Sequence, residues 1–422
     1  MRGKILIHSI VFSPDGVSTA YLYNDIAMGL LSAGFEVIVL TTTPHYNVLQ
    51  EELERQPLIP RFGGLFYESD FNGLKVIHVP QKKFSNALLR IVGFCYWHLV
   101  SFILGMKQKH LSLILSPSPP LTIGLINLAI GKLKRAKVIY NVQEIYPDFL
   151  INKGSLRFKP VISLLKLVEK AVYNGSDAVT TIDPMFYQSI VSRFKDRSKL
   201  HIIPNFVDTD IFKPIEDYKR GLNSEFFPEK DSTLKVMYAG NIGHAQDWRP
   251  FLQVAKELKE FQIEFWIIGE GVMRPELESE IEANGLTNVH LIAYQKRELM
   301  PAVIAYADIH FIFMAPEMEK EGFPSKVYTI MACSKPLLVT SGINTPINNF
   351  LKPIGCAKLI ETTSFENKCN EIAEFLKQVY LDKNLLSVMG KRGYELIQGH
   401  YSKRPVISKY ISLIDQIISE NQ

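Results

Sequence analysis

Strand-length apolar runs alternate with helix-length segments along almost the whole chain, and this alternation limits the possible folds more than any other feature. Strands joined by crossover helices run parallel in one sheet. The chain has 422 residues, too many for a single hydrophobic core, which predicts two domains. We expect one series of strands at Lys4–Val11, Glu36–Thr41, Leu111–Ser116, Lys137–Val142, Asp177–Ile182 and Lys199–Ile203, and a second at Leu234–Ala239, Ile263–Ile268, Val289–Ile292, Ile309–Phe313, Pro336–Val339 and Ala357–Ile360.

The stretch from Pro204 to Asp231 separates the two series. It is rich in Pro, Asp, Glu and Lys and has no clear period, so we place the interdomain connection there. Each half opens with a strand that runs into a glycine turn and then a helix. We therefore predict an α/β protein of two Rossmann-like domains that face each other across a cleft, with a ligand at the carboxyl ends of the strands. The predicted parts are a domain over 1–205, a domain over 206–400, and residues 401–422, whose helix Arg404–Ile418 packs back on the first domain.

Charge and cysteine usage narrow the classes of function. The net charge of +4 is small and argues against nucleic acid as a partner. The apolar run Met1–Phe12 has no small-residue cleavage site after it, which favours a first strand over a signal peptide. The cysteines lie far apart and fit no metal-ligand spacing, so we interpret them as reduced core residues of a cytosolic protein: Cys95, Cys333, Cys356 and Cys369.

The segment Ala87–Met106, "ALLRIVGFCYWHLVSFILGM", departs from the pattern because it is apolar over a length that could span a bilayer. On a helical wheel its polar residues Arg90, His98 and Ser101 form one narrow stripe. Three interpretations are open: a helix buried in the domain, a helix lying in a membrane interface, and a spanning helix. A lone span would break the sheet connections of an α/β domain. Lysines flank the segment at Lys82, Lys83, Lys107 and Lys109.

In the first half, polar and small residues follow two of the predicted strands. Gly16 comes after the first strand, where a glycine permits a positive φ and the close approach of a ligand, although a purely structural turn fits equally well. Gln143, Glu144 and Asp148 follow the strand Lys137–Val142. Such residues at a strand's carboxyl end are site candidates where a cleft is independently argued.

In the second half, the stretch "VMYAGNIGHAQDWRPFL" resembles a phosphate-binding turn without a cation. Gly240 and Gly243 bracket a tight turn, and backbone amides at such a turn attract anions. No Lys or Arg lies between Gly240 and Trp248 to neutralise one. Another strand end, "IIGEGV", carries Gly269 and Glu270. These two strand ends are therefore candidates for one anion-binding edge.

The missing cation is predicted to be Lys326 in "EGFPSK". Pro324 stands where a helix would start, and Ser325 is a suitable cap. A lysine in the first helical turn opposes the helix dipole by a few tenths of a kcal/mol, so a bound anion would favour it there. A solvated surface lysine is the alternative.

The chain resembles the retaining glycosyltransferases of family 4, which have the GT-B fold, over essentially its whole length. The resemblance rests on five motifs in family order: "PDGVSTAYLYNDIAMGLLSAGFEVIVLT", "VQEIYPD", "PNFVDTDIF", "YAGNIGHAQ" and "EGFPSKVYTIMACSKPLLV". Two carboxylates alone do not make a metal site. The resemblance agrees, because it assigns Asp208 and Asp210 to the family's interdomain turn and implies no essential metal or cofactor. The "GN-G--Q" and "PSK" forms are similar to the subgroup that adds N-acetylated amino-deoxyhexoses in O-antigen or capsule assembly.

By this resemblance the first domain holds the acceptor and the second a nucleotide-sugar donor. The implied reaction moves a sugar from a UDP-sugar to a lipid-linked saccharide, with front-face attack and retained configuration, at the cytoplasmic face of the plasma membrane with the enzyme peripherally associated. The candidate catalytic residues are Gln143, Glu144 and Asp148; the candidate donor-binding residues are Gly16, Gly240, Asn241, Gly243, Gln246, Gly269, Glu270, Glu321, Pro324, Ser325 and Lys326.

The chain departs from the family pattern at four positions. Asn241 and Gln246 replace a common Arg and Lys, Gln143 replaces a common His, and Thr329 replaces the second glutamate of an acidic pair that begins at Glu321 and contacts ribose. Two other classes of protein stay open: a non-hydrolysing UDP-sugar epimerase of the same fold, and an inactive GT-B protein that acts as a binding partner.

Overall fold

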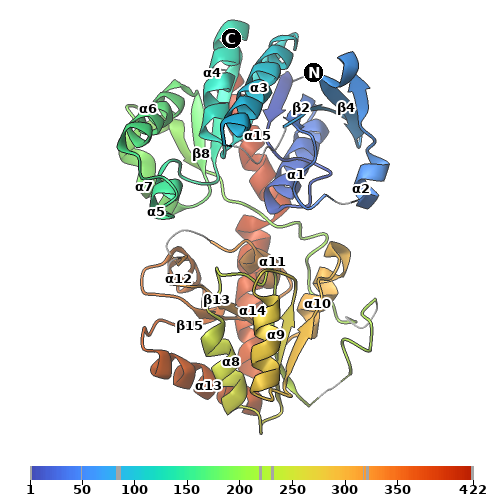
Figure 1. The fold of residues 1–422 in the computed structure, drawn as a ribbon, viewed down its shortest axis with the longest axis vertical. Coiled ribbons are helices and arrows are strands. Elements are labelled where there is room, and N and C mark those ends of the chain that lie inside the picture. Colours follow the sequence, from blue (N-terminus) through green and yellow to red (C-terminus); the bar gives the residue numbers. More distant parts are fainter. Residues whose placement is uncertain are drawn as a thin grey trace. The chain divides into compact units, whose positions relative to one another are not determined.

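The computed structural model describes residues 2–48, 50–81, 87–217, 221–229, 232–316, 318–319 and 323–419. The chain divides into two compact units (Figure 1). Unit 1 is Met1–Asn205 together with Arg404–Gln422, and unit 2 is Phe206–Lys403. Each unit is a parallel sheet covered by helices, as the alternating pattern predicts.

Unit 1 has a nine-stranded sheet of order β3-β4-β5-β2-β1-β6-β7-β8-β9. Only β4 runs antiparallel to its neighbours. The chain builds outwards from β1 on both sides, so the direction of winding changes between β1 and β6, and ligands bind at the carboxyl ends beside such a switch point. The strands are β1 Lys4–His8, β2 Glu36–Thr42, β3 Ile59–Arg61, β4 Phe66–Phe71, β5 Leu74–Val79, β6 Leu111–Pro117, β7 Lys137–Val142, β8 Ala178–Thr181 and β9 Leu200–Ile202.

The hairpin β4–β5 and the short strand β3 are absent from the predicted strand series. The turn of the hairpin is Asn72-Gly73, with φ of 51° and 85°. Asn-Gly with two positive φ values is the preferred two-residue hairpin turn, because its twist matches that of the strands. The sequence therefore contained a signal for these strands. Beyond it, β5 joins the core through Val76, Ile77 and Val79.

The helices of unit 1 include the C-terminal one, α15, which lies among the first-half elements in Figure 1. Gly29 on α1 marks its contact, since a Cβ at that position would lie 2.6 Å from Ile407 Cγ2. The missing side chain lets the two helices approach closely. The helices are α1 Ser18–Ser32, α2 Gln50–Arg55, α3 Ala87–Met106, α4 Leu121–Lys134, α5 Asp148–Asn152, α6 Lys159–Gly175, α7 Pro184–Ile190 and α15 Lys403–Ser419.

Helix α3 turns its apolar face outward. Trp97 and Ser101 are fully buried against the sheet, so Ser101 of the predicted polar stripe faces the protein. His98, also in that stripe, bonds to Thr122 on α4 at 2.9 Å. The large apolar side chains on the opposite face are 46–61% exposed: Ile91, Val92, Leu99 and Ile103. We call these four residues the α3 face.

Two further expectations for α3 can be compared with the structure. Cys95 is exposed beside the α3 face, so the prediction that all four cysteines are core residues is wrong for this one. In the described part of the chain, no helix combines the length and apolarity needed to cross a bilayer. Lys82 and Lys83, and the side chain of Arg90, lie outside what the structure describes.

Unit 2 has a fully parallel six-stranded sheet of order β12-β11-β10-β13-β14-β15. Its winding reverses between β10 and β13, which places the second switch point there. Phe251, Phe265, Phe311 and Phe313 are fully or almost fully buried and form its aromatic core. The strands are β10 Leu234–Ala239, β11 Ile263–Ile268, β12 Val289–Ile292, β13 Ile309–Phe313, β14 Leu337–Thr340 and β15 Ala357–Ile360; the helices are α8 Trp248–Glu257, α9 Arg274–Ala283, α10 Met300–Tyr306, α11 Lys326–Ala332, α12 Pro346–Leu351, α13 Phe365–Leu381 and α14 Asn384–Leu396.

The α1–α15 contact gives a stability prediction. An alanine in place of glycine normally stabilises a helix by about 1 kcal/mol. At Gly29 the new methyl group would collide with Ile407, so we expect Gly29→Ala to destabilise unit 1 by about 1–3 kcal/mol. Calorimetric unfolding measures this change. In the double variant with Ile407→Ala the two losses should be less than additive, whereas strict additivity would contradict the contact.

Candidate functional site

Unit 1 gathers amide side chains at the carboxyl edge of its sheet. Gln143, directly after β7, donates from Nε2 to Asn141 Oδ1 (2.6 Å) and Asn205 Oδ1 (3.0 Å). Asn205 donates back to Gln143 Oε1 at 2.9 Å. Asn141 also accepts from Tyr23 and donates to Thr180. The network holds Gln143 in one orientation and ties together α1, β7, β8 and the segment after β9.

Glu144 is positioned by the end of the neighbouring strand. Ser118, directly after β6, accepts from Gln143 N (3.1 Å) and donates to Glu144 O (3.0 Å). Burial raises the pKa of the Glu144 carboxyl, while Lys153 and a hydrogen bond from Tyr146 oppose that shift. A partly desolvated carboxylate at a strand end is suited to proton or hydroxyl chemistry.

Asp148, the third candidate catalytic residue, is held by structural partners. It begins α5, and its carboxylate pairs with Arg193, which also pairs with the buried Glu169 of α6. Arg193 thus joins α5 and α6 by two charge-assisted hydrogen bonds. The structure shows Asp148 as part of this ion-pair cluster.

Gly16 has a role in the loop after β1. Its amide donates to Tyr46 O and Asn47 O, both at 3.1 Å. It does not adopt a positive φ, so the conformation that a glycine permits at this position is not used. The neighbouring Asp15 is 2% exposed and accepts from the amides of His45 and Tyr46 at 2.8 Å. The loop after β1 is therefore fastened to the loop after β2.

In unit 2, the glycine turn after β10 uses most of its own amides. Gly240 N donates to Ile268 O (2.9 Å), Ile242 N to Glu270 O (2.9 Å), and Gly243 N to Gln246 Oε1 (3.2 Å). These amides are therefore engaged within the protein and contribute little to an anion. The side-chain amides of Asn241 and Gln246 keep their NH₂ groups as neutral donors.

The start of α8 is also poorly suited to an anion. Asp247 occupies the N-cap position and pairs with Arg249 at 2.8 Å. Its carboxylate occupies the place where a helix dipole would attract a negative group. An anion at this edge therefore depends on a cation from another element.

Gly269 and Gly271 let two loops meet backbone to backbone. A Cβ at Gly269 would lie 1.9 Å from Gly240 O, and one at Gly271 would lie 2.0 Å from Ile242 O. Both residues have φ near 150°. The contact between the loop after β10 and the loop after β11 and the positive φ values therefore both require glycine at these positions. Glu270 between them is half exposed and pairs with Arg274 at 3.4 Å.

Lys326 is the first residue of α11, and its side chain reaches the glycine turn. Its Nζ would lie 2.4 Å from a Cβ at Gly240, and it faces the ring of Tyr238 at 3.9 Å from the centroid. The residue as a whole is partly exposed, but its ammonium end is buried, and burial lowers the pKa of Lys326 to about 7. No carboxylate contributes to that pKa. The structure therefore brings Lys326 to Gly240, as the sequence predicted, and among the residues that it describes no carboxylate pairs with Lys326.

Of the other residues in "EGFPSK", the structure describes Phe323, Pro324 and Ser325. Ser325 is exposed at the N-cap of α11 without making a capping hydrogen bond. Pro324 precedes it, and Thr329 donates to Lys326 O at 2.9 Å. Glu321 lies outside the described residues.

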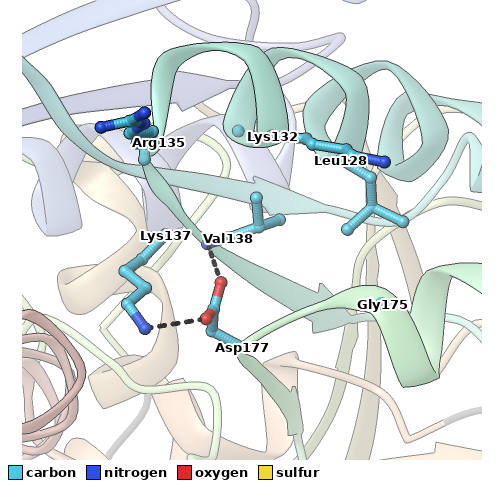
Figure 2. A pocket seen from close by; sticks show the side chains of 9 residues that line it. Leu128, Lys132, Arg135, Lys137, Val138, Gly175 and Asp177 are labelled. Carbon is cyan, nitrogen blue, oxygen red and sulfur yellow. Dashed lines mark hydrogen bonds and ion pairs between the residues drawn. The ribbon is translucent and has the colours of Figure 1, made fainter. Parts of the chain in front are cut away.

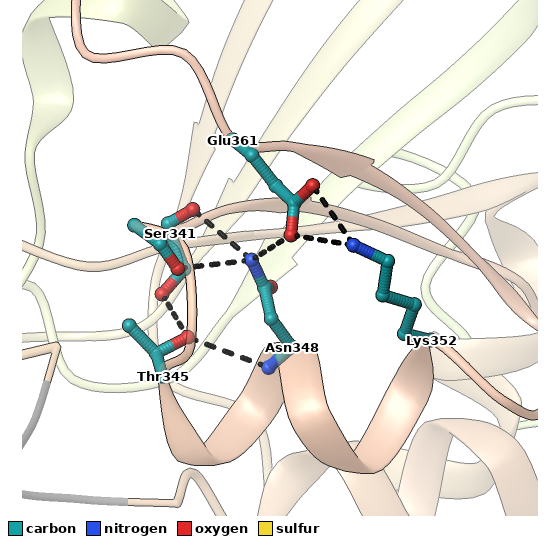
Figure 3. A network of polar contacts seen from close by, with 6 residues as sticks. Ser341, Thr345, Asn348, Lys352 and Glu361 are labelled. Carbon is teal, nitrogen blue, oxygen red and sulfur yellow. Dashed lines mark hydrogen bonds and ion pairs between the residues drawn. The ribbon is translucent and has the colours of Figure 1, made fainter.

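A polar network after β14 was missed by the sequence analysis (Figure 3). Asn348 of α12 donates to Ser341 O (3.2 Å), Gly342 O (3.1 Å) and Glu361 Oε1 (3.4 Å). Lys352 pairs with Glu361. The network fixes the loop after β14 against the end of β15. Its members lie between Ser341 and Glu361 but in separate elements, and no recognised motif marks them.

A shallow, open surface pocket lies at the other edge of unit 1, away from Gln143 (Figure 2). It has a volume of about 450 Å³ and lies where β7 begins and α4 and α6 end. Its acidic residue Asp177 is already engaged, by Lys137 at 3.1 Å and by Val138 N at 2.9 Å. Lys132 and Arg135 line it as well, but in Figure 2 their charged ends diverge. This arrangement does not converge on one ligand.

Comparisons with known proteins place both halves of the chain in glycosyltransferase families. The model described as "Glycosyltransferase Family 4" matches residues 20–211, and the model described as "Glycosyl transferases group 1" matches residues 220–396. A similar curated protein is the putative colanic acid biosynthesis glycosyl transferase WcaI of Escherichia coli strain K12. It is 21% identical over 373 residues, which cover 86% of this chain and 89% of that protein.

Solved structures agree on the fold. Sucrose-phosphate synthase from Thermosynechococcus elongatus superposes with a TM-score of 0.74 at 14% identity, over 99% of this chain and 100% of that one. Anabaena Alr3699/HepE in complex with UDP superposes with a TM-score of 0.71 at 12% identity, over 98% and 100%. At such identities the likeness establishes the architecture of the two Rossmann-like units.

Proposed function

The chain belongs to the family 4 glycosyltransferases of GT-B fold, and from that premise we propose that unit 2 binds a UDP-sugar and unit 1 a lipid-linked saccharide acceptor. The sugar is an N-acetylated hexosamine or deoxyhexosamine, and the product is a surface polysaccharide of the O-antigen or capsule class. The "GN-G--Q" and "PSK" forms support the sugar class. The similarity to a protein named for colanic acid biosynthesis supports the pathway class.

The observation that carries the donor assignment is the ammonium of Lys326 beside Gly240, at the switch point of unit 2. Exposed turn amides and helix ends stabilise an anion by about 0.3–1 kcal/mol each, and most amides of this turn are already engaged. A full cation at about 4 Å adds about 1–4 kcal/mol, depending on how dry the site is. Lys326 is therefore proposed to carry most of the binding energy for the diphosphate.

On the acceptor side, Gln143 and Glu144 are the proposed contacts. Transfer breaks the bond between the anomeric carbon and the diphosphate oxygen and forms a bond from that carbon to the acceptor oxygen. The acceptor proton passes to the leaving diphosphate, so the reaction needs no covalent intermediate on the protein. Glu144 orients the acceptor hydroxyl or the donor sugar, and the amide network fixes Gln143 beside it. Asp148 is proposed to act indirectly, by fixing α5 through Arg193.

Membrane association is proposed to use the α3 face. Helix α3 buries Ser101 and bonds His98 to α4, while the four large apolar side chains of the α3 face are exposed, which is unusual for a helix surface that faces water. Such a face suits the headgroup–acyl boundary of a membrane. Lys107 and Lys109 at the end of α3 are exposed and would meet anionic lipid, at about 1 kcal/mol for each charge.

The donor assignment predicts a selective loss in Lys326→Ala. UDP should bind at least about tenfold more weakly, because the variant lacks the ammonium, while uridine should bind nearly as in the wild type. Isothermal titration calorimetry with both ligands measures this ratio. Lys256→Ala, which removes an exposed lysine on α8, is the matched control and should change neither affinity. Equal losses for UDP and uridine, or none for either, would refute the assignment.

The acceptor assignment predicts a separation of rate from affinity in Glu144→Gln. The amide keeps the shape of the carboxyl but not its charge, so we expect turnover to fall by about 10²-fold or more with near-normal UDP affinity. Because the pKa of Glu144 is raised and its ionised form is the active one, wild-type turnover should fall as pH drops through that pKa. Asp148→Asn should mainly lower thermal stability. Wild-type turnover in Glu144→Gln would show that the loop is only structural.

These assays also separate the two rival functions. An epimerase would convert UDP-GlcNAc without an acceptor, whereas a transferase requires one. An inactive binding partner would bind UDP without turnover in the presence of any lipid-linked acceptor.

The membrane assignment predicts loss of vesicle binding when the α3 face is made polar. Leu99→Gln/Ile103→Gln should reduce cosedimentation with phosphatidylglycerol–phosphatidylcholine vesicles several-fold, because each change removes exposed apolar surface from the interface. Leu381→Gln/Val388→Gln removes equally exposed apolar side chains from unit 2 and is the control. Wild-type binding by the α3 variant, or failure of the wild-type protein to bind these vesicles, would contradict the assignment.

A further inference from the structure

The ammonium of Lys326 has an aromatic partner that the family pattern did not point to. Lys326 Nζ lies 3.9 Å from the ring centroid of Tyr238, the shortest cation–ring distance among the residues that the structure describes. Tyr238 is the fifth residue of β10 and is 2% exposed. A cation at that distance over a ring face is attracted by the negative side of the ring quadrupole.

Few other described groups near Lys326 could stabilise its ammonium form. Within the described ranges, the titratable groups that face it are the phenol of Tyr238 on β10 and the imidazole of His310 on β13. Burial lowers the pKa of His310 to about 3, and Lys326 contributes to that shift, so the imidazole is neutral. Tyr238 is also neutral because burial raises its pKa well above the usual range. The ring face is therefore the main group that favours the ammonium form before a ligand arrives.

Tyr238 makes a second contact that can be separated from the first. Its hydroxyl donates to Asn241 O at 2.7 Å and so pulls a carbonyl of the glycine turn inward. Trp248 does the same to Gly243 O at 3.3 Å. The face of the ring thus meets the cation, and the hydroxyl meets the turn. Removing only the hydroxyl tests one contact without the other.

We propose that Tyr238 is a positioning residue for the donor, whose ring holds the Lys326 ammonium against the Gly240 turn so that it meets the diphosphate. This inference rests on the proposed role of Lys326 and adds the group that keeps Lys326 in place. Gly240 completes the arrangement, because any side chain there would occupy the position of Nζ.

An ordinary core role for Tyr238 makes different predictions. The ring also packs against Trp248 and Phe313, with centroids 5.0 and 5.1 Å away. A core residue contributes packing, which any aromatic ring of the same shape preserves. A cation-holding ring contributes electrostatics, which depends on the electron density of its face.

The test is a series of rings of one shape and different electron density at position 238. Phenylalanine, 4-fluorophenylalanine and 3,4,5-trifluorophenylalanine are introduced in place of Tyr238, and UDP and uridine affinities are measured by calorimetry from about pH 5 to about pH 9, a range that spans the pKa of Lys326. UDP affinity should fall stepwise with fluorination, by about three- to tenfold in total, while uridine affinity stays constant. Because binding requires protonated Lys326, the pH above which UDP affinity declines should also move down along the series.

Controls separate this inference from the proposed function. Phe313→Leu removes a neighbouring ring that makes no described cation contact, so it should lower stability and leave the pH dependence of UDP binding unchanged. A series in which UDP affinity and its pH dependence do not change would overturn the role of Tyr238 alone, provided that Lys326→Ala still weakens UDP. If Lys326→Ala leaves UDP binding intact, the donor assignment itself fails and the role of Tyr238 fails with it.

Discussion

The parallel arrangement of the strands is the constraint on which both candidate sites depend. A parallel sheet brings all of its strand ends to one edge, and a switch in winding direction leaves a gap between two neighbouring ends where backbone and side chains can meet a ligand. In unit 1 the residues after β6, β7 and β9 meet there through Ser118, Gln143 and Asn205. In unit 2 the loops after β10 and β11 meet beside the switch point, and α11 adds Lys326 next to Gly240 at the end of β10. Residues far apart in sequence become neighbours because the sheet aligns them.

At the glycine turn of unit 2, the backbone and the side chains have different roles. Gly240, Gly269 and Gly271 allow the loops after β10 and β11 to touch. The amides that this contact turns inward donate hydrogen bonds to protein carbonyls. The turn is therefore rigid but weakly electropositive. The nearest cation is Lys326, whose ammonium is buried against the ring of Tyr238. The turn without a cation in the sequence thus acquires one through tertiary contact.

For helix α3, the amino-acid sequence alone does not show which side chains face solvent. Its sequence is compatible with a buried helix, an interfacial helix or a span. The structure places Trp97 and Ser101 against the sheet and leaves large apolar side chains outward. The buried side also contains Val100 and Leu104, so the helix is apolar on both sides, and packing one side against the sheet leaves the other as an exposed apolar surface.

The sequence by itself determined the α/β class, the main parallel strands, the family, and the nearness of Lys326 to the glycine turn, because these follow from local periodicity and from motifs at strand ends. It also contained the Asn72-Gly73 signal for the β4–β5 hairpin. Only the tertiary structure decided that Asp148 pairs with Arg193 and that Tyr238 lies under an ammonium 88 positions further along the chain. A side chain's partners depend on which faces pack together, and no periodicity within one segment carries that information.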